Sequence, residues 1–108
     1  MGKIIPILDI IQDMKSHKVN ILPSTSKNLE IMGEQICLAR KRRKLNLQLV
    51  ADRSGLSRKT VSKIEKGDPS VSMGAYAAVL HALDGIDDDL TLLAKSDITG
   101  RRIQDLNL

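Results

Sequence analysis

Aromatic residues are almost absent from this chain of 108 residues, which has one tyrosine, Tyr76, and neither tryptophan nor phenylalanine. Proteins that bind single-stranded nucleic acid or RNA usually stack bases on exposed aromatic rings. A single ring cannot form such a platform. The composition therefore argues against both classes of binding protein.

Cysteine is equally scarce, because Cys37 is the only one. One thiol excludes an intramolecular disulfide and a zinc site built from several cysteines, and it fits a reducing cytosol. We interpret Cys37, one position from the apolar face of a helix, as an inert core thiol. His17 and His81 lie far apart in the sequence, and no nucleophile with an acid–base pair is evident. We expect no catalytic site, no cofactor and no metal site.

Long apolar runs are missing as well, and none approaches the roughly 18 residues of a membrane-spanning helix. Asp9 interrupts the apolar residues 4–8 and no small-residue cleavage site follows, so we expect no signal peptide. Apolar residues still form 42% of the chain, enough for a globular core. We expect a small cytoplasmic domain, of a size at which dimerisation often adds stability.

Positive charge is concentrated in the middle of the chain. Residues 36–67 contain ten Lys and Arg but only Asp52 and Glu65 as acids, whereas residues 68–108 contain three bases and seven acids. The formal net charge of the whole chain is +4. The basic segment indicates either a phosphate-bearing partner or a solvated surface, and charge alone does not separate the two.

The chain before residue 29 has no clear periodicity. Residues 7–14 have a loosely helical apolar pattern, and residues 19–22 alternate like a short strand. The stretch 23–28 is rich in Ser, Thr and Asn and predicts a linker. We therefore divide the chain into an N-terminal extension at 1–28, a domain at 29–95 and a C-terminal tail at 96–108.

The domain has the apolar spacing of helices throughout, which predicts an all-α fold of five helices. Asn46, Ser57 and Ser72 are N-cap candidates, and Asp87 to Asp89 would place negative charge at the start of the fifth helix rather than hold a metal. In the tail, Ile103, Leu106 and Leu108 indicate an extended or docking segment. The helices are expected at 29–44, 47–54, 58–66 and 73–83, with the fifth starting at the three acids.

Residues 46–66 have the layout of a helix-turn-helix, with two short helices joined at a glycine. Ala51 is small where the two helices would cross, and Gly55 can adopt the positive φ of a tight turn. Val61 and Ile64 would hold the second helix on the domain, which leaves its other face free.

That free face is polar and strongly basic. A helix fits the major groove of B-DNA, where Arg and Lys commonly donate to guanine O6 and N7. Exposed helices can be basic for solubility alone, but the glycine turn favours DNA binding. The residues on this face are Arg58, Lys59, Ser62, Lys63 and Lys66.

Residues 32–83 resemble the phage-repressor-type (Xre/Cro-like) helix-turn-helix domain, a five-helix all-α fold that binds DNA. The resemblance is most specific between Val50 and Gly67. The matching residues are Met32, Gly33, Ile36, Arg40, Arg43, Leu45, Val50, Ala51, Gly55, Leu56, Ser57, Thr60, Val61, Ser62, Ile64, Glu65, Lys66, Gly67 and Ser72.

The resemblance implies that the helix at 58–66 is the recognition helix. It implies base contacts by Arg58, Lys59 and Lys63, with Ser62 nearby. It also places Ser57 and Lys66 near phosphates, and we expect the basic run to add phosphate contacts. The expected phosphate contacts are Ser57, Lys66, Gln48, Arg42, Arg43 and Lys44.

Two further residues carry expectations from the same resemblance. It implies a buried ion pair between Arg40 and Glu65, which would join the first helix to the recognition helix. Leu47 stands where the family usually has a glutamine that binds a phosphate. Gln48, or the free backbone N–H groups at that helix start, could take over this role.

The C-terminal half shows a narrower resemblance, to the HipB-like antitoxins. The similar residues are Pro69 to Ser72, Leu80, Ala82, Leu83, Leu90 and Gly100 to Gln104. This resemblance implies a dimeric autorepressor that binds a HipA-like serine/threonine kinase toxin. The acidic C-terminal half and the two tails would make the dimer and toxin contacts.

We therefore expect a homodimeric repressor that is the antitoxin of a type II toxin–antitoxin module. It would neutralise a HipA-like kinase toxin and repress its own operon, and it would lie on the bacterial nucleoid when it is bound to its operator. It would bind a palindromic operator in double-stranded DNA, with half-sites about 34–36 Å apart. Two alternatives stay open. One is a stand-alone phage or chromosomal repressor without a toxin, and the other is a protein-interaction module on a vestigial helix-turn-helix.

Overall fold

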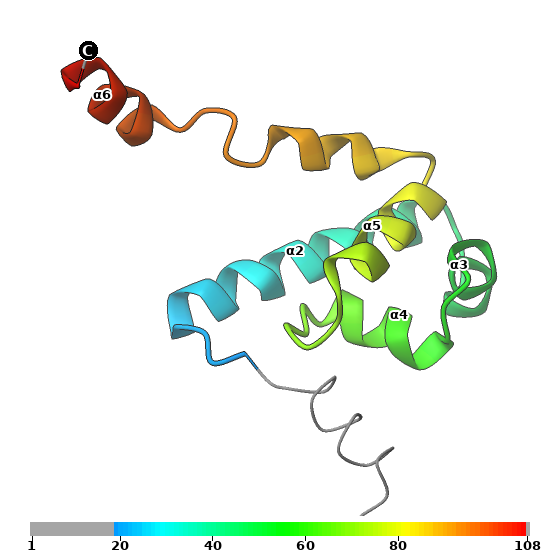
Figure 1. Ribbon diagram of the computed structural model, residues 1–108. Helices are drawn as coiled ribbons and strands as arrows, with labels where there is room; N and C mark the ends of the chain where they lie inside the picture. The colour runs from blue at the N-terminus through cyan, green and yellow to red at the C-terminus, as the bar shows by residue number, and fades with distance from the viewer. Residues whose placement is uncertain (1–18, 108) are drawn as a thin grey trace, which may run out of the picture.

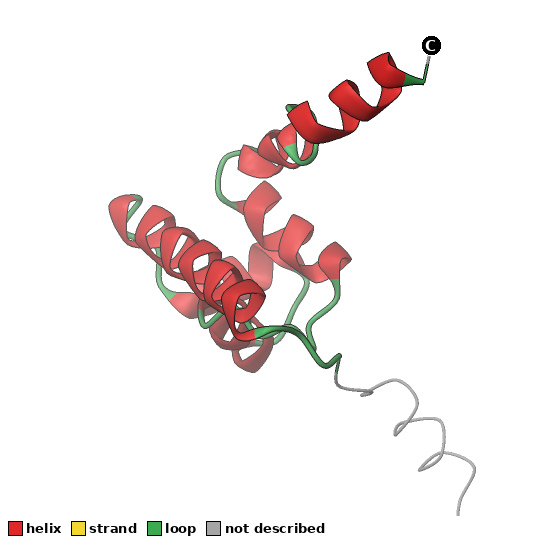
Figure 2. Cartoon of the chain, turned by 90° about the vertical axis from the view of Figure 1, so that its left-hand side faces the viewer, coloured by secondary structure: helices red, strands yellow, loops and turns green. Residues whose placement is uncertain are grey.

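The computed structural model describes residues 19–107, and all the regular structure in this range is helical. The expectation of an all-α fold is confirmed. Helices α2 to α5 form a bundle, and α6 lies apart from it (Figures 1 and 2). No helix in this range is long and apolar enough to cross a membrane. The helices are α2 (Pro23–Arg42), α3 (Leu47–Ser54), α4 (Arg58–Glu65), α5 (Met73–Ala82), the 3₁₀ helix η1 (Ile86–Leu92) and α6 (Ile98–Leu106).

Two expectations for the residues before the domain are wrong. Residues 19–22 form no strand, and residues 23–28 are not a linker but the first turns of α2. Pro23 occupies the start of this helix, where its missing N–H costs nothing and its fixed φ suits the helix. The helical pattern expected at 7–14 lies outside the described residues.

The region after α5 also differs from expectation. The fifth helix is a 3₁₀ helix, η1, with Asp87, Asp88 and Asp89 in its first turn. The tail is not extended, because residues 98–106 form α6. The Asp97 side chain caps α6 by accepting a hydrogen bond from the Gly100 N–H at 3.0 Å, which favours helix at this point.

The three predicted N-caps of the domain are confirmed. The side chains of Asn46, Ser57 and Ser72 each accept a hydrogen bond from the backbone N–H three residues further on, at 2.8, 3.1 and 3.1 Å. These bonds satisfy N–H groups that have no partner inside the helix. Helices α3, α4 and α5 therefore begin at the residues that the sequence predicted.

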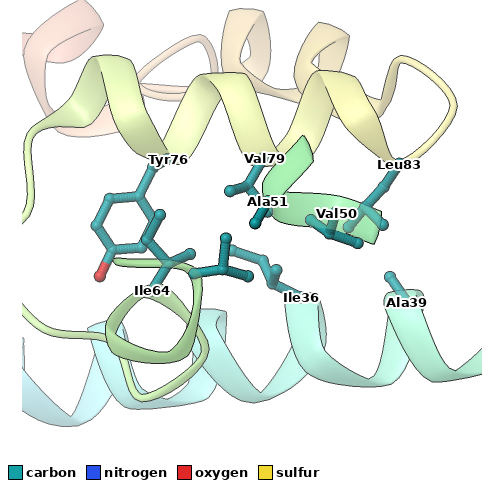
Figure 3. Close-up of a cluster of buried hydrophobic side chains, with 9 residues drawn as sticks. Ile36, Ala39, Val50, Ala51, Ile64, Tyr76, Val79 and Leu83 are labelled. Atoms are coloured by element: carbon teal, nitrogen blue, oxygen red, sulfur yellow. The ribbon is translucent and has the colours of Figure 1, made fainter. Parts of the chain in front are cut away.

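The hydrophobic core lies between α2, α3, α4 and α5, where aliphatic side chains from all four helices meet (Figure 3). The two apolar residues of α4, Val61 and Ile64, are both 0% exposed. Burial of each stabilises the domain by about 1.5–3 kcal/mol, and fixes which face of α4 points outward. The buried residues are Ile36, Ala39, Val50, Ala51, Val61, Ile64, Tyr76, Val79 and Leu83.

Tyr76 extends from α5 to the edge of this core, and its hydroxyl donates to the backbone carbonyl of Asp68 at 2.8 Å. Burial, with a smaller contribution from the Asp68 charge, raises the pKa of Tyr76 from 10.0 to about 12. The folded protein therefore favours the neutral phenol. Any stability gained from this preference is complete below pH 10 and is lost as the pH rises toward 12.

The single tyrosine makes this shift directly measurable, because the near-ultraviolet absorbance of tyrosinate reports Tyr76 alone. We expect a titration midpoint near pH 12 in the folded protein, and near pH 10 in urea. Circular dichroism at each pH checks that the protein is still folded. A midpoint near pH 10 with the helices intact would contradict the burial of this hydroxyl.

Two glycines let α2 and the end of α4 approach at backbone distance. A Cβ atom on Gly33 would lie 2.5 Å from the Gly67 nitrogen and 2.7 Å from the Ile64 carbonyl oxygen. Gly67 has a φ of +73° and lies against the backbone of Leu29. This close crossing sets the position of α4 against α2, and no side chain other than hydrogen fits at either glycine.

Candidate nucleic-acid interface

The turn between α3 and α4 depends on the backbone conformation of Gly55, which has a φ of 71°. A Cβ at this position would meet nothing within 4 Å, so conformation rather than space makes glycine favourable here. The Leu56 N–H donates to the Ala51 carbonyl at 3.0 Å and closes the end of α3. The turn thereby fixes the angle at which α4 leaves α3.

A mostly buried ion pair holds the far end of α4. The structure brings together the two residues of the expected pair: Arg40 Nε lies 2.7 Å from Glu65 Oε2, and Nη2 lies 3.0 Å from Oε1. The two side chains are only 12% and 9% exposed. The hydrogen bonds that Arg40 donates to Glu65 raise the pKa of Arg40, which stays charged. Arg40 is thus turned inward and is part of the scaffold.

The same guanidinium contacts two more groups. Its Nη1 donates to the Leu45 carbonyl at 2.9 Å, and its Nη2 lies 3.8 Å from the sulfur of Cys37. Arg40 therefore ties together α2, the turn that follows it and α4. Cys37 is half-buried beside this pair.

The outward face of α4 carries only positive charge. Arg58, Lys59, Lys63 and the capping residue Lys66 are exposed, and Ser62 is half-buried. Within residues 19–107, none of these four basic side chains has a hydrogen bond or an ion pair. The one acid of α4, Glu65, is occupied by Arg40. The face is thus free to meet an anionic partner.

The start of α3 lies beside the start of α4. A hollow of about 420 Å³ separates them, lined by Arg40, Asn46, Leu47, Gln48 and Arg58. Leu47 is half-buried against the core, and the Gln48 amide donates to Asp52 at 2.8 Å. The first four N–H groups of a helix have no partners inside the helix. In α3 the Asn46 side chain accepts only one of them, from Leu49. This helix end can therefore attract an anion.

The basic run at the end of α2 is divided by the structure. Lys44 is exposed in the turn before α3, at a φ of 56°. Arg43 instead pairs with Asp84 at 2.7 Å, and Arg42 lines a hollow between α2, α5 and η1. The sequence did not reveal the Arg43 pair, because Asp84 lies 41 residues further along the chain.

A second group of residues next to α4 was not identified from the sequence. Lys63 shares a hollow of about 420 Å³ with Val19 and the turn at 68–70. In that turn the Asp68 carboxylate accepts hydrogen bonds from the Ser70 N–H at 2.8 Å and from its hydroxyl at 2.7 Å. Only the three-dimensional structure brings these residues to the end of the basic face.

Comparison with known proteins gives one match. A family model described as helix-turn-helix matches residues 38–89, from the end of α2 into η1. Searches of curated proteins and of solved structures gave no match. The matched range contains the Gly55 turn, the capped α4 and both residues of the Arg40–Glu65 ion pair. Residues 38–89 therefore form a helix-turn-helix domain of the Xre/Cro-like type, and this match supports a role for the protein as a DNA-binding regulator.

Proposed function

We propose that this regulator is a sequence-specific repressor that inserts α4 into the major groove of double-stranded DNA. The observation that carries the proposal is the outward face of α4, which has exposed basic residues and no acid free to oppose DNA. A helix with its side chains is about 10–12 Å across and the major groove is about 12 Å wide. Val61 and Ile64 hold the opposite face in the core.

Four residues of α4 are proposed to read the bases: Arg58, Lys59, Ser62 and Lys63. The first two lie in the first turn of the helix and Lys63 lies in its last turn. Such spacing along a groove lets one helix meet several successive base pairs. Arg and Lys would donate to guanine, and the Ser62 hydroxyl could pair with any base.

Phosphate contacts are proposed on either side of α4. Ser57 and Lys66 lie at the two ends of this helix, while Gln48 and Lys44 lie near the start of α3. The free N–H groups of α3 would add to the same contact. Arg43 would first have to leave Asp84, and Arg42 lies on the side of α2 that faces η1. These two arginines have the least structural support among the six expected phosphate contacts.

Lys63→Ala and Lys44→Ala form a matched pair of variants that tests these roles. Lys63→Ala should weaken binding to the promoter of the protein's own gene by about 1–3 kcal/mol and relax the preference at one base position. Lys44→Ala should weaken binding to all duplexes alike, and reduce the salt dependence by about one counterion. Fluorescence anisotropy on the native duplex and on single-base variants, at several salt concentrations, measures both effects.

Each role has an outcome that would refute it. A base-selective effect of Lys44→Ala would remove Lys44 from the phosphate group, and a uniform effect of Lys63→Ala would remove Lys63 from the reading group. If the wild-type protein shows no salt-sensitive binding to any duplex, the chain is better explained as a protein-interaction module on a vestigial helix-turn-helix.

We further propose that the repressor acts as a homodimer and is the antitoxin of a toxin–antitoxin pair. It would neutralise a HipA-like kinase and repress its own operon. The resemblance of residues 69–104 to HipB-like antitoxins supports this, together with the exposed apolar residues of η1 and α6. Co-purification with a kinase encoded by the neighbouring gene tests the proposal. If no such gene adjoins, a stand-alone repressor is the better conclusion.

A further inference from the structure

Helix α6 exposes an apolar surface that nothing in the described chain covers. Ile98, Ile103 and Leu106 are 64%, 55% and 86% exposed, and no residue of α6 is buried. The helix lies away from the bundle in both views (Figures 1 and 2). Isolated helices shorter than about 12–15 residues are marginal in water, and α6 has nine. A packing partner would therefore stabilise it.

The bundle also has an apolar groove that no residue between 19 and 107 fills. Two adjoining hollows of about 430 and 440 Å³ lie between α2, α5 and η1, and the second also borders residues 19–21 and the turn at 68–71. They share the side chains of Met32, Leu80, Leu90 and Leu93. No residue of α3 or α4 lines either hollow, and the groove meets the basic face only at one end, where the second hollow shares Val19, Asp68 and Pro69 with the hollow beside Lys63.

The groove is long enough to hold α6. The lining residues on α2 run from Asn28 to Arg42, which corresponds to about 20 Å at the rise of an α-helix. The nine residues of α6 span about 13 Å. The whole apolar face of α6 can therefore lie within the groove.

The two surfaces carry charges that can pair, since each has bases and acids: α6 contains Asp105 besides its two arginines, and Arg42 lines the groove together with Asp89. Helix α6 carries Arg101 and Arg102, and both are exposed. Asp89 lines one hollow of the groove, and the exposed Asp88 precedes it in η1. Within residues 19–107 neither of these carboxylates has a hydrogen bond or an ion pair. An α6 in the groove would bring each sign near its opposite.

We propose that the groove of one protomer receives α6 of its partner, and that the exchange is reciprocal. Residues 93–97 lead α6 away from its own bundle, and one chain carries both the donor helix and the groove. Two copies related by a twofold axis satisfy both surfaces at once. The inference names the surface of the proposed repressor dimer, and to that extent it rests on the proposed function.

Inter-chain cysteine pairing tests the exchange directly. In a Cys37→Ser background, a chain with Ile103→Cys is mixed with a longer-tagged chain with Leu93→Cys, unfolded, refolded together and oxidised. We expect a disulfide-linked species that contains one chain of each length. Leu38→Cys is the matched control, because Leu38 is exposed on α2 but does not line the groove, and it should give no such species.

A dissociation measurement gives the size of the effect. In sedimentation equilibrium, Ile103→Lys should raise the dimer dissociation constant on the order of tenfold or more, because the dimer buries this residue twice. Arg102→Glu should also weaken the dimer, and adding Asp89→Arg to the same chain should restore part of the loss. Circular dichroism confirms that each variant retains the folded bundle.

Three results would overturn the inference. One is a disulfide within a single chain that carries both Ile103→Cys and Leu93→Cys. Another is a wild-type dimer whose dissociation constant Ile103→Lys leaves unchanged. The third is a wild-type protein that is monomeric and co-purifies with the kinase, together with an Ile103→Lys variant that no longer co-purifies with it. In that case α6 would bind the toxin and not a second copy of this chain.

DNA binding separates this inference from the proposed function. A weakened dimer should still bind a half-site duplex through α4, at higher protein concentration. If the dimer uses α6 but no duplex is bound, the repressor proposal fails and the exchange stands. If a dimer whose stability does not depend on α6 binds DNA, the proposed exchange of α6 is wrong and the repressor proposal stands.

Discussion

Replacing Glu65 with alanine is expected to lower the free energy of unfolding by about 3–5 kcal/mol, since the change leaves one charge of a buried pair without its partner. The guanidinium of Arg40 is only 12% exposed and makes two short contacts to the carboxylate. Water cannot fully replace these contacts at that position. Small domains are stable by only about 5–15 kcal/mol, so the loss is a large part of the total.

Urea unfolding followed by circular dichroism measures this loss, and a second ion pair supplies the control. Asp84→Asn removes the partner of Arg43, but Asp84 is 70% exposed and the pair should contribute no more than about 1 kcal/mol. Asparagine also tolerates the positive φ of 62° at that position. The prediction fails if Glu65→Ala costs no more than Asp84→Asn.

The same variant should bind DNA more weakly. Glu65 is the last residue of α4, and its bond to Arg40 fixes that end of the helix against α2. Without this bond the basic side chains are less well positioned, and part of the binding free energy is spent on ordering them. Affinity should be measured without urea, at a temperature where circular dichroism shows that the variant is folded. Unchanged affinity would separate the ion pair from DNA binding.

Gly33→Ala is the second change with a large expected effect. Its methyl group would lie 2.5–2.8 Å from three backbone atoms at the end of α4 and in the following turn. Backbone cannot rotate aside as a side chain can, so α2 and α4 must separate. Overpacking typically costs about 1–3 kcal/mol, and we expect this variant at or above the upper end.

Gly74→Ala is the matched control for that change. Gly74 also lies in a helix, α5, but its added Cβ would have as its nearest neighbour the Ser72 hydroxyl at 3.9 Å. Alanine is the better helix former by about 0.5–1 kcal/mol, so this variant should be more stable than wild type. The midpoint temperatures of thermal unfolding should therefore shift in opposite directions, down for Gly33→Ala and up for Gly74→Ala. Equal shifts would mean that the crossing at Gly33 is looser than described.

The helix-turn-helix could be predicted from the sequence because its signals are local. Asn46 and Ser57 mark helix starts through bonds to residues three positions away, and Gly55 marks the turn by its own conformation. The alternating buried and basic positions of α4 follow from helical periodicity. Their buried members, Val61 and Ile64, lie in the core as expected.

Features that depend on distant residues were not predictable in the same way. The Ser- and Asn-rich stretch after Pro23 has the composition of a linker, yet it forms the first turns of α2. This helix packs against residues more than 30 positions later in the chain. The partner of Arg43 and the apolar groove arise only when α2, α5 and η1 come together. The helical state of the tail was missed because apolar spacing over so few residues does not distinguish helix from strand.

Helix α2 has a further consequence, because both surfaces discussed above share it. On one side Gly33 and Arg40 hold α4, and on the other Met32 and Ala39 border the groove. A single helix of 20 residues thus positions α4 and also forms one wall of the apolar groove. If a helix bound in the groove shifts α2, it changes the affinity of the protein for the operator. Thermodynamic linkage then requires operator binding to change the affinity for the bound helix by the same factor.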